Sequence, residues 1–114
     1  MRPAIVVFAT LIISTVTHSA IIYVPDDYAT IQGAIDASVS GDSVIVRPGT
    51  YVENIDFLGK LITVRSEKGT DATVIDGNNA GNVVKFRTGE GSGSLLQGFT
   101  ICNGSGILGW MTYP

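Results

Sequence analysis

The chain has few of the residue types that build small catalytic or metal sites. Its 114 residues include one cysteine, Cys102, and one histidine, His18, so an internal disulfide, a cysteine-rich zinc site and a Cys–His catalytic pair are excluded. There are 7 Lys or Arg against 10 Asp or Glu, and the basic residues are scattered. This balance argues against nucleic acid or an anionic membrane surface as partner, and favours a neutral or cationic one. Hydrophobic burial must hold together what is, by length, one domain.

Residues 1–19 have the order of features found in a secretory signal peptide. Arg2 supplies a positive charge, an uncharged run from Ala4 to Thr17 follows, and Thr17 and Ser19 are small. A membrane-spanning helix takes roughly 20 residues, so a transmembrane anchor is the weaker alternative. The sequence predicts cleavage after Ser19 and no membrane attachment afterwards. The mature domain, residues 20–114, is then secreted, periplasmic or at the cell surface.

One amphipathic helix is predicted near the start of the mature domain, over residues 30–39. Its apolar positions recur at helical spacing, at Ile31, Ala34 and Ile35. Thr30 is a suitable N-cap, and Gly41 is the expected stop because glycine tolerates the left-handed conformation that ends many helices.

The pattern after Gly41 is that of many short strands. Runs rich in β-branched or aromatic residues alternate with glycine-rich turns, and no helical spacing lies between them. The runs are 44–46, 51–52, 54–57, 61–64, 73–75, 83–86 and 95–101. An all-β architecture is predicted.

The apolar ends of these runs recur at a nearly fixed period. Val46, Val64, Phe86 and Leu108 follow one another at similar intervals, and Phe57, Ile75 and Phe99 form a second series of the same kind. The common interval of about 20 residues is the signature of a repeat architecture. It predicts a parallel solenoid of about three coils over residues 42–109, each stacked about 4.8 Å from the last. A Greek-key sandwich with evenly spaced turns is the alternative.

Two segments carry a family resemblance, residues 30–77 and the GFTICNG segment at residues 98–104. They closely resemble the N-terminal part of secreted right-handed parallel β-helix proteins of the pectin lyase-like superfamily. The resemblance covers roughly residues 24–107. It implies an all-β, right-handed parallel β-helix whose first coil is covered by an N-terminal capping helix. Such a helix would hide unpaired backbone groups at the end of the solenoid.

The resemblance also implies an extracellular polysaccharide as partner, but it assigns no site. Members of the superfamily cleave or modify acidic polysaccharides with Asp, Arg, Lys or bound calcium on later coils, and none of those motifs occurs in this chain. No catalytic, cofactor-binding or metal-binding residue is carried over. We therefore predict a carbohydrate-associated or structural module that is non-catalytic as it stands. The alternatives are a fragment of a polysaccharide lyase whose catalytic coils are missing, and a cell-surface adhesion repeat protein.

Several polar residues near strand ends have either a local or a functional interpretation. Asn54, Asn78 and Asn103 are candidates for corner residues whose amides stack between coils, or they are ordinary turn residues. The carboxylates nearest strand ends are Asp42, Glu53, Asp56 and Asp76. Paired carboxylates can act as general acid and base, but isolated surface carboxylates are far commoner, and that is our interpretation.

Four further patterns are weak as site signals. Residues 104–109 match G-x-G-x-x-G without the helix and second strand that a dinucleotide site needs. Residues 76–87 begin like a calcium loop but end in Arg87 instead of glutamate. Residues 89–94 lack the lysine of a phosphate loop. Residues 103–105 form a glycosylation sequon, which is common by chance.

The last residues, 109–114, leave the repeating pattern and contain no helix or polar cap. A solenoid needs a cap at each end to hide its core. This ending predicts either a truncated reading frame or self-association through the open end, with Trp110 and Tyr113 in the contact.

Overall fold

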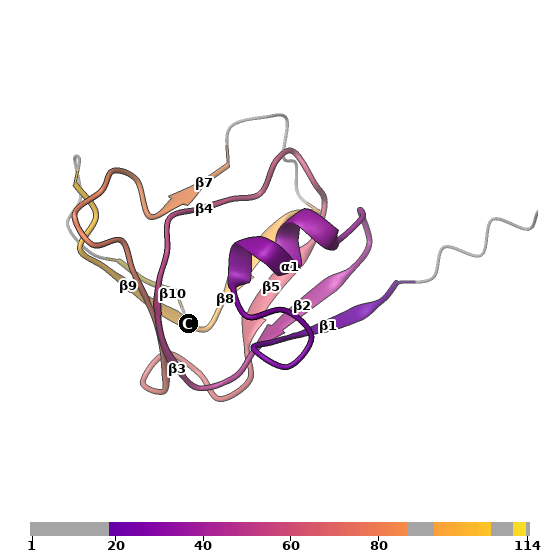
Figure 1. The fold of residues 1–114 in the computed structure, drawn as a ribbon, viewed down its shortest axis with the longest axis horizontal. Coiled ribbons are helices and arrows are strands. Elements are labelled where there is room, and N and C mark those ends of the chain that lie inside the picture. Colours follow the sequence, from indigo (N-terminus) through magenta and orange to yellow (C-terminus); the bar gives the residue numbers. More distant parts are fainter. Residues whose placement is uncertain (1–18, 87–92, 106–110, 114) are drawn as a thin grey trace, which may run out of the picture.

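The computed structural model describes residues 19–86, 93–105 and 111–113 (Figure 1). Within these ranges the chain forms one short helix and ten strands. In chain order the elements are β1 (Ile21–Val24), α1 (Ile31–Ala37), β2 (Ser43–Val46), β3 (Gly49–Val52), β4 (Ile55–Asp56), β5 (Thr63–Ser66), β6 (Thr73–Asp76), β7 (Val84–Lys85), β8 (Leu95–Gln97), β9 (Phe99–Cys102) and β10 (Met111–Tyr113).

The strands form three parallel sheets that the chain visits in turn. Sheet A has the order β1-β2-β5-β8, sheet B contains β3, β6 and β9, and sheet C pairs β4 with β7. The chain runs from A to B to C and then returns to A one strand further along (Figure 1). This is a parallel β-solenoid of about three turns with one helix at its start, and it confirms the predicted fold class.

The last described strand departs from the coil pattern. β10 pairs with β9 in the antiparallel sense, with Met111 opposite Ile101 and Tyr113 opposite Phe99. It therefore occupies the edge of sheet B that a further parallel strand would otherwise take. The coils were predicted to continue through residue 109, and residues 106–109 lie outside the described part.

The interior columns of the solenoid correct the predicted register. Ile22, Val44, Val64 and Leu96 lie opposite one another in sheet A. Val46 lies opposite Ser66, so the predicted pairing of Val46 with Val64 is wrong. The interval from Val64 to Leu96 is the longest of the column. It includes the segment between β7 and β8, which no fixed period anticipates.

The second predicted series is also wrong in register. Ile75 lies opposite Tyr51 and Ile101, and not opposite Phe57 or Phe99. Phe57 is fully buried beyond β4. Phe86, expected inside, remains 46% exposed. Its ring packs on that of Phe57 with 4.3 Å between the ring centroids.

The helix begins where the sequence predicts and ends earlier. Thr30 is the N-cap, and its Oγ1 accepts a hydrogen bond from the backbone N–H of Gly33 at 3.0 Å. The helix ends at Ala37 with Ser38 as C-cap in an extended conformation. The Ser38 hydroxyl donates to the Ile35 carbonyl at 2.7 Å and fixes this turn. Gly41 lies in the following turn, so the predicted stop at Gly41 is wrong.

Side chains join the first turn of α1 to the edge of the first coil. Both Glu53 carboxylate oxygens accept hydrogen bonds, from the backbone N–H groups of Ile31 and Gln32 at 2.9 and 3.0 Å. The side-chain amide of Gln32 forms two hydrogen bonds with the backbone of β4, as a neighbouring strand would. It donates to the Asp56 carbonyl at 3.1 Å and accepts from the Asp56 N–H at 2.7 Å. These contacts satisfy groups that an open edge would expose, as expected of a capping helix.

Lys60 holds the other end of α1. Its ammonium donates to the carbonyl oxygens of Ile35, Asp36 and Ser38 at 2.7, 2.9 and 2.7 Å. The last carbonyls of a helix have no partner within the helix. A cation at this end also interacts favourably with the partial negative charge of the helix dipole.

Replacing Lys60 with alanine should lower the free energy of unfolding by about 1.5–3 kcal/mol, because charge-assisted hydrogen bonds to the helix carbonyls are lost. Thermal unfolding followed by circular dichroism measures the change. Lys68→Ala is the matched control, since the exposed Lys68 side chain makes no hydrogen bond or ion pair with the described residues. Equal melting of the two variants would contradict the role given to Lys60.

Candidate functional site

The outer face of sheet A carries one row of side chains contributed by all four strands. Tyr23, Ile45, Arg65 and Gln97 lie opposite one another in the parallel register, and we call them the outer row. Neighbouring parallel strands lie about 4.8 Å apart, so the row crosses the coils as a ladder. Arg65 and Gln97 are exposed, whereas Ile45 is 3% exposed. We infer that the longer side chains of Tyr23 and Arg65 cover Ile45.

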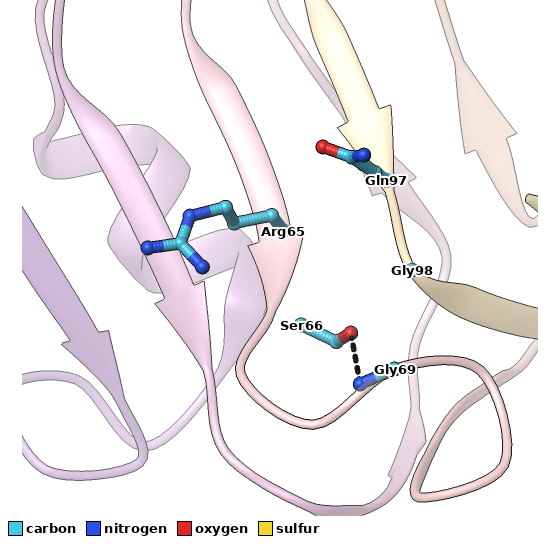
Figure 2. A pocket seen from close by; sticks show the side chains of 5 residues that line it. All are labelled: Arg65, Ser66, Gly69, Gln97 and Gly98. Carbon is cyan, nitrogen blue, oxygen red and sulfur yellow. Dashed lines mark hydrogen bonds between the residues drawn. The ribbon is translucent and has the colours of Figure 1, made fainter. Parts of the chain in front are cut away.

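A shallow hollow lies beside the exposed end of the outer row (Figure 2). Its volume is about 240 Å³, and its lining is Arg65, Ser66, Gly69, Gln97 and Gly98. In Figure 2 the Arg65 guanidinium points away from Gln97, and both side chains belong to neighbouring strands. Pockets that enclose small ligands usually measure about 300–1,000 Å³. The hollow suits contact with part of an extended ligand better than enclosure of a small molecule.

Arg65 and Gln97 provide the hydrogen-bonding chemistry of this face. Arg65 forms no ion pair with the described residues. Its guanidinium can therefore donate to a carboxylate or to hydroxyl oxygens. The Gln97 amide both donates and accepts. The outer row contains no carboxylate, so it offers no pair for general acid and base catalysis.

Tyr23, by contrast, is engaged within the protein. The Arg47 guanidinium lies 4.8 Å from the centre of the Tyr23 ring. Arg47 also bonds Asp26 at 2.7 Å and Glu67 at 2.6 Å. The hydrogen bond from Arg47 holds the pKa of Asp26 below its ordinary value. These contacts bind three successive coils together, and they cover one face of the ring that a sugar could otherwise stack on.

The four carboxylates considered from the sequence have separate local roles. Asp42 accepts hydrogen bonds from the backbone N–H groups of Val39 and Ala20, which lower its pKa. Asp76 accepts from the Asn78 N–H and the Asn103 amide, and its pKa is lowered for that reason. Asp56 accepts from the Leu58 N–H at 2.9 Å. Glu53 caps α1, so all four groups serve backbone capping and turns.

The corner asparagines connect coils through different partners. The Asn54 amide donates to the Asn82 carbonyl at 3.0 Å, and the Asn103 amide donates to the Asp76 carboxylate at 3.0 Å. Each bond joins one coil to the next. Asn78 and Asn103 both adopt positive φ, 52° and 53°. Two of the three amides thus bridge coils, as expected of corner residues, but by bonds to a carbonyl and a carboxylate and not to one another.

The remaining sequence patterns give no chemical site in the described residues. Burial, and then the charge of Asp76, raise the pKa of the Cys102 thiol, which keeps it protonated at neutral pH. Residues 19–86 and 93–105 contain no group of three His, Cys, Asp or Glu side chains placed to hold a metal ion. His18, Arg87, Trp110 and most of the patterns at 89–94 and 104–109 lie outside the described residues. Self-association through the end near Trp110 stays a prediction.

The fold defines the class of this protein as a parallel β-solenoid of about three turns. Comparisons with protein-family models, with curated proteins and with solved structures found no match to the chain. In the described ranges, no helix has the length and hydropathy to cross a bilayer.

Sequence reasoning did not identify the outer row. Ile45 lies in the run Val44–Ile45–Val46, which is apolar on both faces, so alternation alone does not say which side of that strand faces out. The spacing of these residues in the sequence does contain a signal of the outer row. Tyr23, Ile45 and Arg65 follow one another at the same intervals as the interior residues of the true register, which begin at Ile22.

Proposed function

We propose that this chain is a secreted β-helix protein of pectin lyase-like type that associates with extracellular polysaccharide without cleaving it. The contact surface is the exposed end of the outer row, Arg65 and Gln97, together with the adjoining hollow. The observation that carries the proposal is that Arg65, whose guanidinium has no ion-pair partner among the described residues, lies opposite the exposed Gln97 of the adjacent strand on one sheet face. An extended polymer can lie across such a ladder of donors and acceptors.

The charges on this face favour a polymer with carboxylate groups at the point of contact. Arg47 is neutralised by Asp26 and Glu67, whereas Arg65 has no such partner in the described part of the chain. Guanidinium groups recognise carboxylates through paired hydrogen bonds. The lack of a carboxylate in the outer row supports binding over hydrolysis, because glycoside hydrolysis needs a pair of carboxyl groups that move protons.

Arg65→Ala should weaken binding to polygalacturonate about tenfold, corresponding to about 1.4 kcal/mol for a lost charge-assisted contact. Titration calorimetry against polygalacturonate and against its methyl-esterified, uncharged form measures the effect. The loss should be smaller for the esterified polymer, while Gln97→Ala should weaken both equally. Lys68→Ala is the control for a change of net charge alone.

Two results would contradict the proposal that the chain binds polysaccharide without cleaving it, and a third would contradict the proposed contact surface. One is that the unaltered chain binds neither polymer. The other is release of unsaturated product from polygalacturonate with calcium, followed by ultraviolet absorbance, which would make the chain an active lyase. Binding that is unchanged by Arg65→Ala and Gln97→Ala would place the contact elsewhere on the solenoid.

A further inference from the structure

Asp42 is a buried carboxylate at the start of the first full coil. The residue is 5% exposed and lies between α1 and β2. Its Oδ1 accepts a hydrogen bond from the backbone nitrogen of Ala20 at 2.9 Å, and its Oδ2 accepts one from Val39 at 2.9 Å. Both donors are neutral peptide groups. A buried carboxylate is stabilised more strongly by a positive partner than by a neutral one.

Ala20 is fixed from both sides of its backbone. Besides the bond from its nitrogen to Asp42, its carbonyl oxygen accepts from the Ser43 N–H at 2.9 Å. The position of the Ala20 nitrogen is therefore set by pairing with the first coil. Ser19 and Ala20 are both exposed, so the peptide bond between them is accessible on the surface.

The same bond is the one at which the sequence predicts removal of the leader. Hydrolysis adds one water across the Ser19–Ala20 peptide bond. Ser19 leaves with a new carboxylate, and the Ala20 nitrogen becomes a primary amine that takes up a proton. An α-amino group has an ordinary pKa of about 7.7–8.0, so this amine carries a positive charge at neutral pH.

We propose that cleavage at Ser19–Ala20 by an endopeptidase of the secretion system creates an ion pair between the new Ala20 α-ammonium and the buried Asp42 carboxylate, which fastens β1 to the first coil. The proposal rests on the secretion that the proposed function assumes. No movement of the strand is needed, because the nitrogen already lies within hydrogen-bond distance of Asp42.

Lys60 is the other charged group that acts on Asp42. Its ammonium is held on the carbonyls at the end of α1, by Ile35, Asp36 and Ser38. The hydrogen bonds from Val39 and Ala20 keep the pKa of Asp42 below its ordinary value, so Asp42 is ionised at neutral pH. The pair raises the pKa of the α-ammonium in the folded state. Its stabilisation is present below about pH 7.7 and is lost as the pH rises through that raised value.

The full chain, expressed in a secreting host, tests the proposal in two steps. Mass spectrometry of the secreted product should find Ala20 as its first residue. A second form carries one glycine inserted between Ser19 and Ala20, so that its amine lies one residue away from Asp42. At pH 6.5 this form should melt about 4–8 °C lower, the shift that about 1 kcal/mol produces in a domain of this size. The difference should vanish at pH 10.

Asp42→Asn in both forms supplies the matched control. The difference in melting between the two forms should disappear with Asp42→Asn and persist with Asp71→Asn, a change at an exposed carboxylate. Should Asp42→Asn fail to fold, an NMR titration of the Ala20 amine in the unaltered product decides, with a pKa above about 8.0 expected.

Three results would overturn the ion pair: a mature chain beginning at another residue, equal melting of the two forms at pH 6.5, or an Ala20 amine with an ordinary pKa. Each of these leaves polysaccharide binding through Arg65 intact. A chain that is not secreted at all would instead remove the premise that both proposals share.

Discussion

Replacing Phe57 with alanine is expected to lower the free energy of unfolding by about 3–5 kcal/mol, a large part of the roughly 5–15 kcal/mol that holds a typical domain together. Phe57 is fully buried and is among the largest side chains of the core. Removing its ring leaves a cavity where sheet C meets the rest of the interior, and such a small core has few side chains that could refill it. Urea unfolding followed by fluorescence or circular dichroism gives the change.

Phe86→Ala is the matched control for this prediction. The Phe86 ring packs at a tilt against Phe57 with a centroid distance of 4.3 Å, but Phe86 is 46% exposed. Its removal should lower stability by about 1 kcal/mol, because less surface returns to water. A Phe57→Ala variant no less stable than Phe86→Ala would show that the interior of the solenoid is not where the structure places it.

Gly98→Ala is expected to lower stability by about 2–5 kcal/mol, the sum of two effects. Gly98 has φ of 84°, a conformation that disfavours a residue with a side chain by about 1–2 kcal/mol. A β-carbon at this position would also overlap the hydroxyl oxygen of Ser66, and such overpacking adds about 1–3 kcal/mol. The loss is measured by urea unfolding at fixed protein concentration.

Gly69→Ala separates the two contributions. Gly69 has φ of 93°, and a β-carbon added there would meet nothing within 4 Å. It should lose only the conformational part, about 1–2 kcal/mol. If the two alanine variants unfold at the same urea concentration, the close approach of Gly98 to Ser66 is not a constraint on the fold.

The existence of the solenoid could be predicted because it depends on features that repeat. Short β-branched runs, glycine-rich turns and a nearly fixed period each follow from the need to turn three corners per coil. The helix start could be predicted from Thr30, because an N-cap is a local signal. Its end was not predicted, because the carbonyl oxygens there are bonded by Lys60 of the first coil, a contact between residues far apart in the sequence.

The register of the strands could not be predicted from the sequence, for a physical reason. A run such as Val44–Ile45–Val46 is apolar throughout. If such a strand is shifted by one residue against its neighbour, similar apolar side chains still face inward. Coil length also varies, because Val64 and Leu96 lie opposite one another although the chain between them is longer than in the preceding coils. Arg65 and Gln97 lie opposite one another only in the true register, so the candidate site could not be predicted either. The resemblance to the pectin lyase-like superfamily predicted helix and coils but named no residue of the site.

The capping contacts of α1 all fall within the first coil, so the beginning of the solenoid does not depend on how many coils follow. Glu53, Asp56 and Lys60 supply the polar bonds to the helix, and none of the described strands beyond β4 takes part in them. Coils added or deleted beyond β7 would leave these capping bonds in place. Residues 20–60 thus contain these polar bonds between the helix and the first coil, while β2, β3 and β4 pair with strands of the next coil. Transplanted onto another solenoid, this segment would need from its host a following coil whose strands pair with β2, β3 and β4.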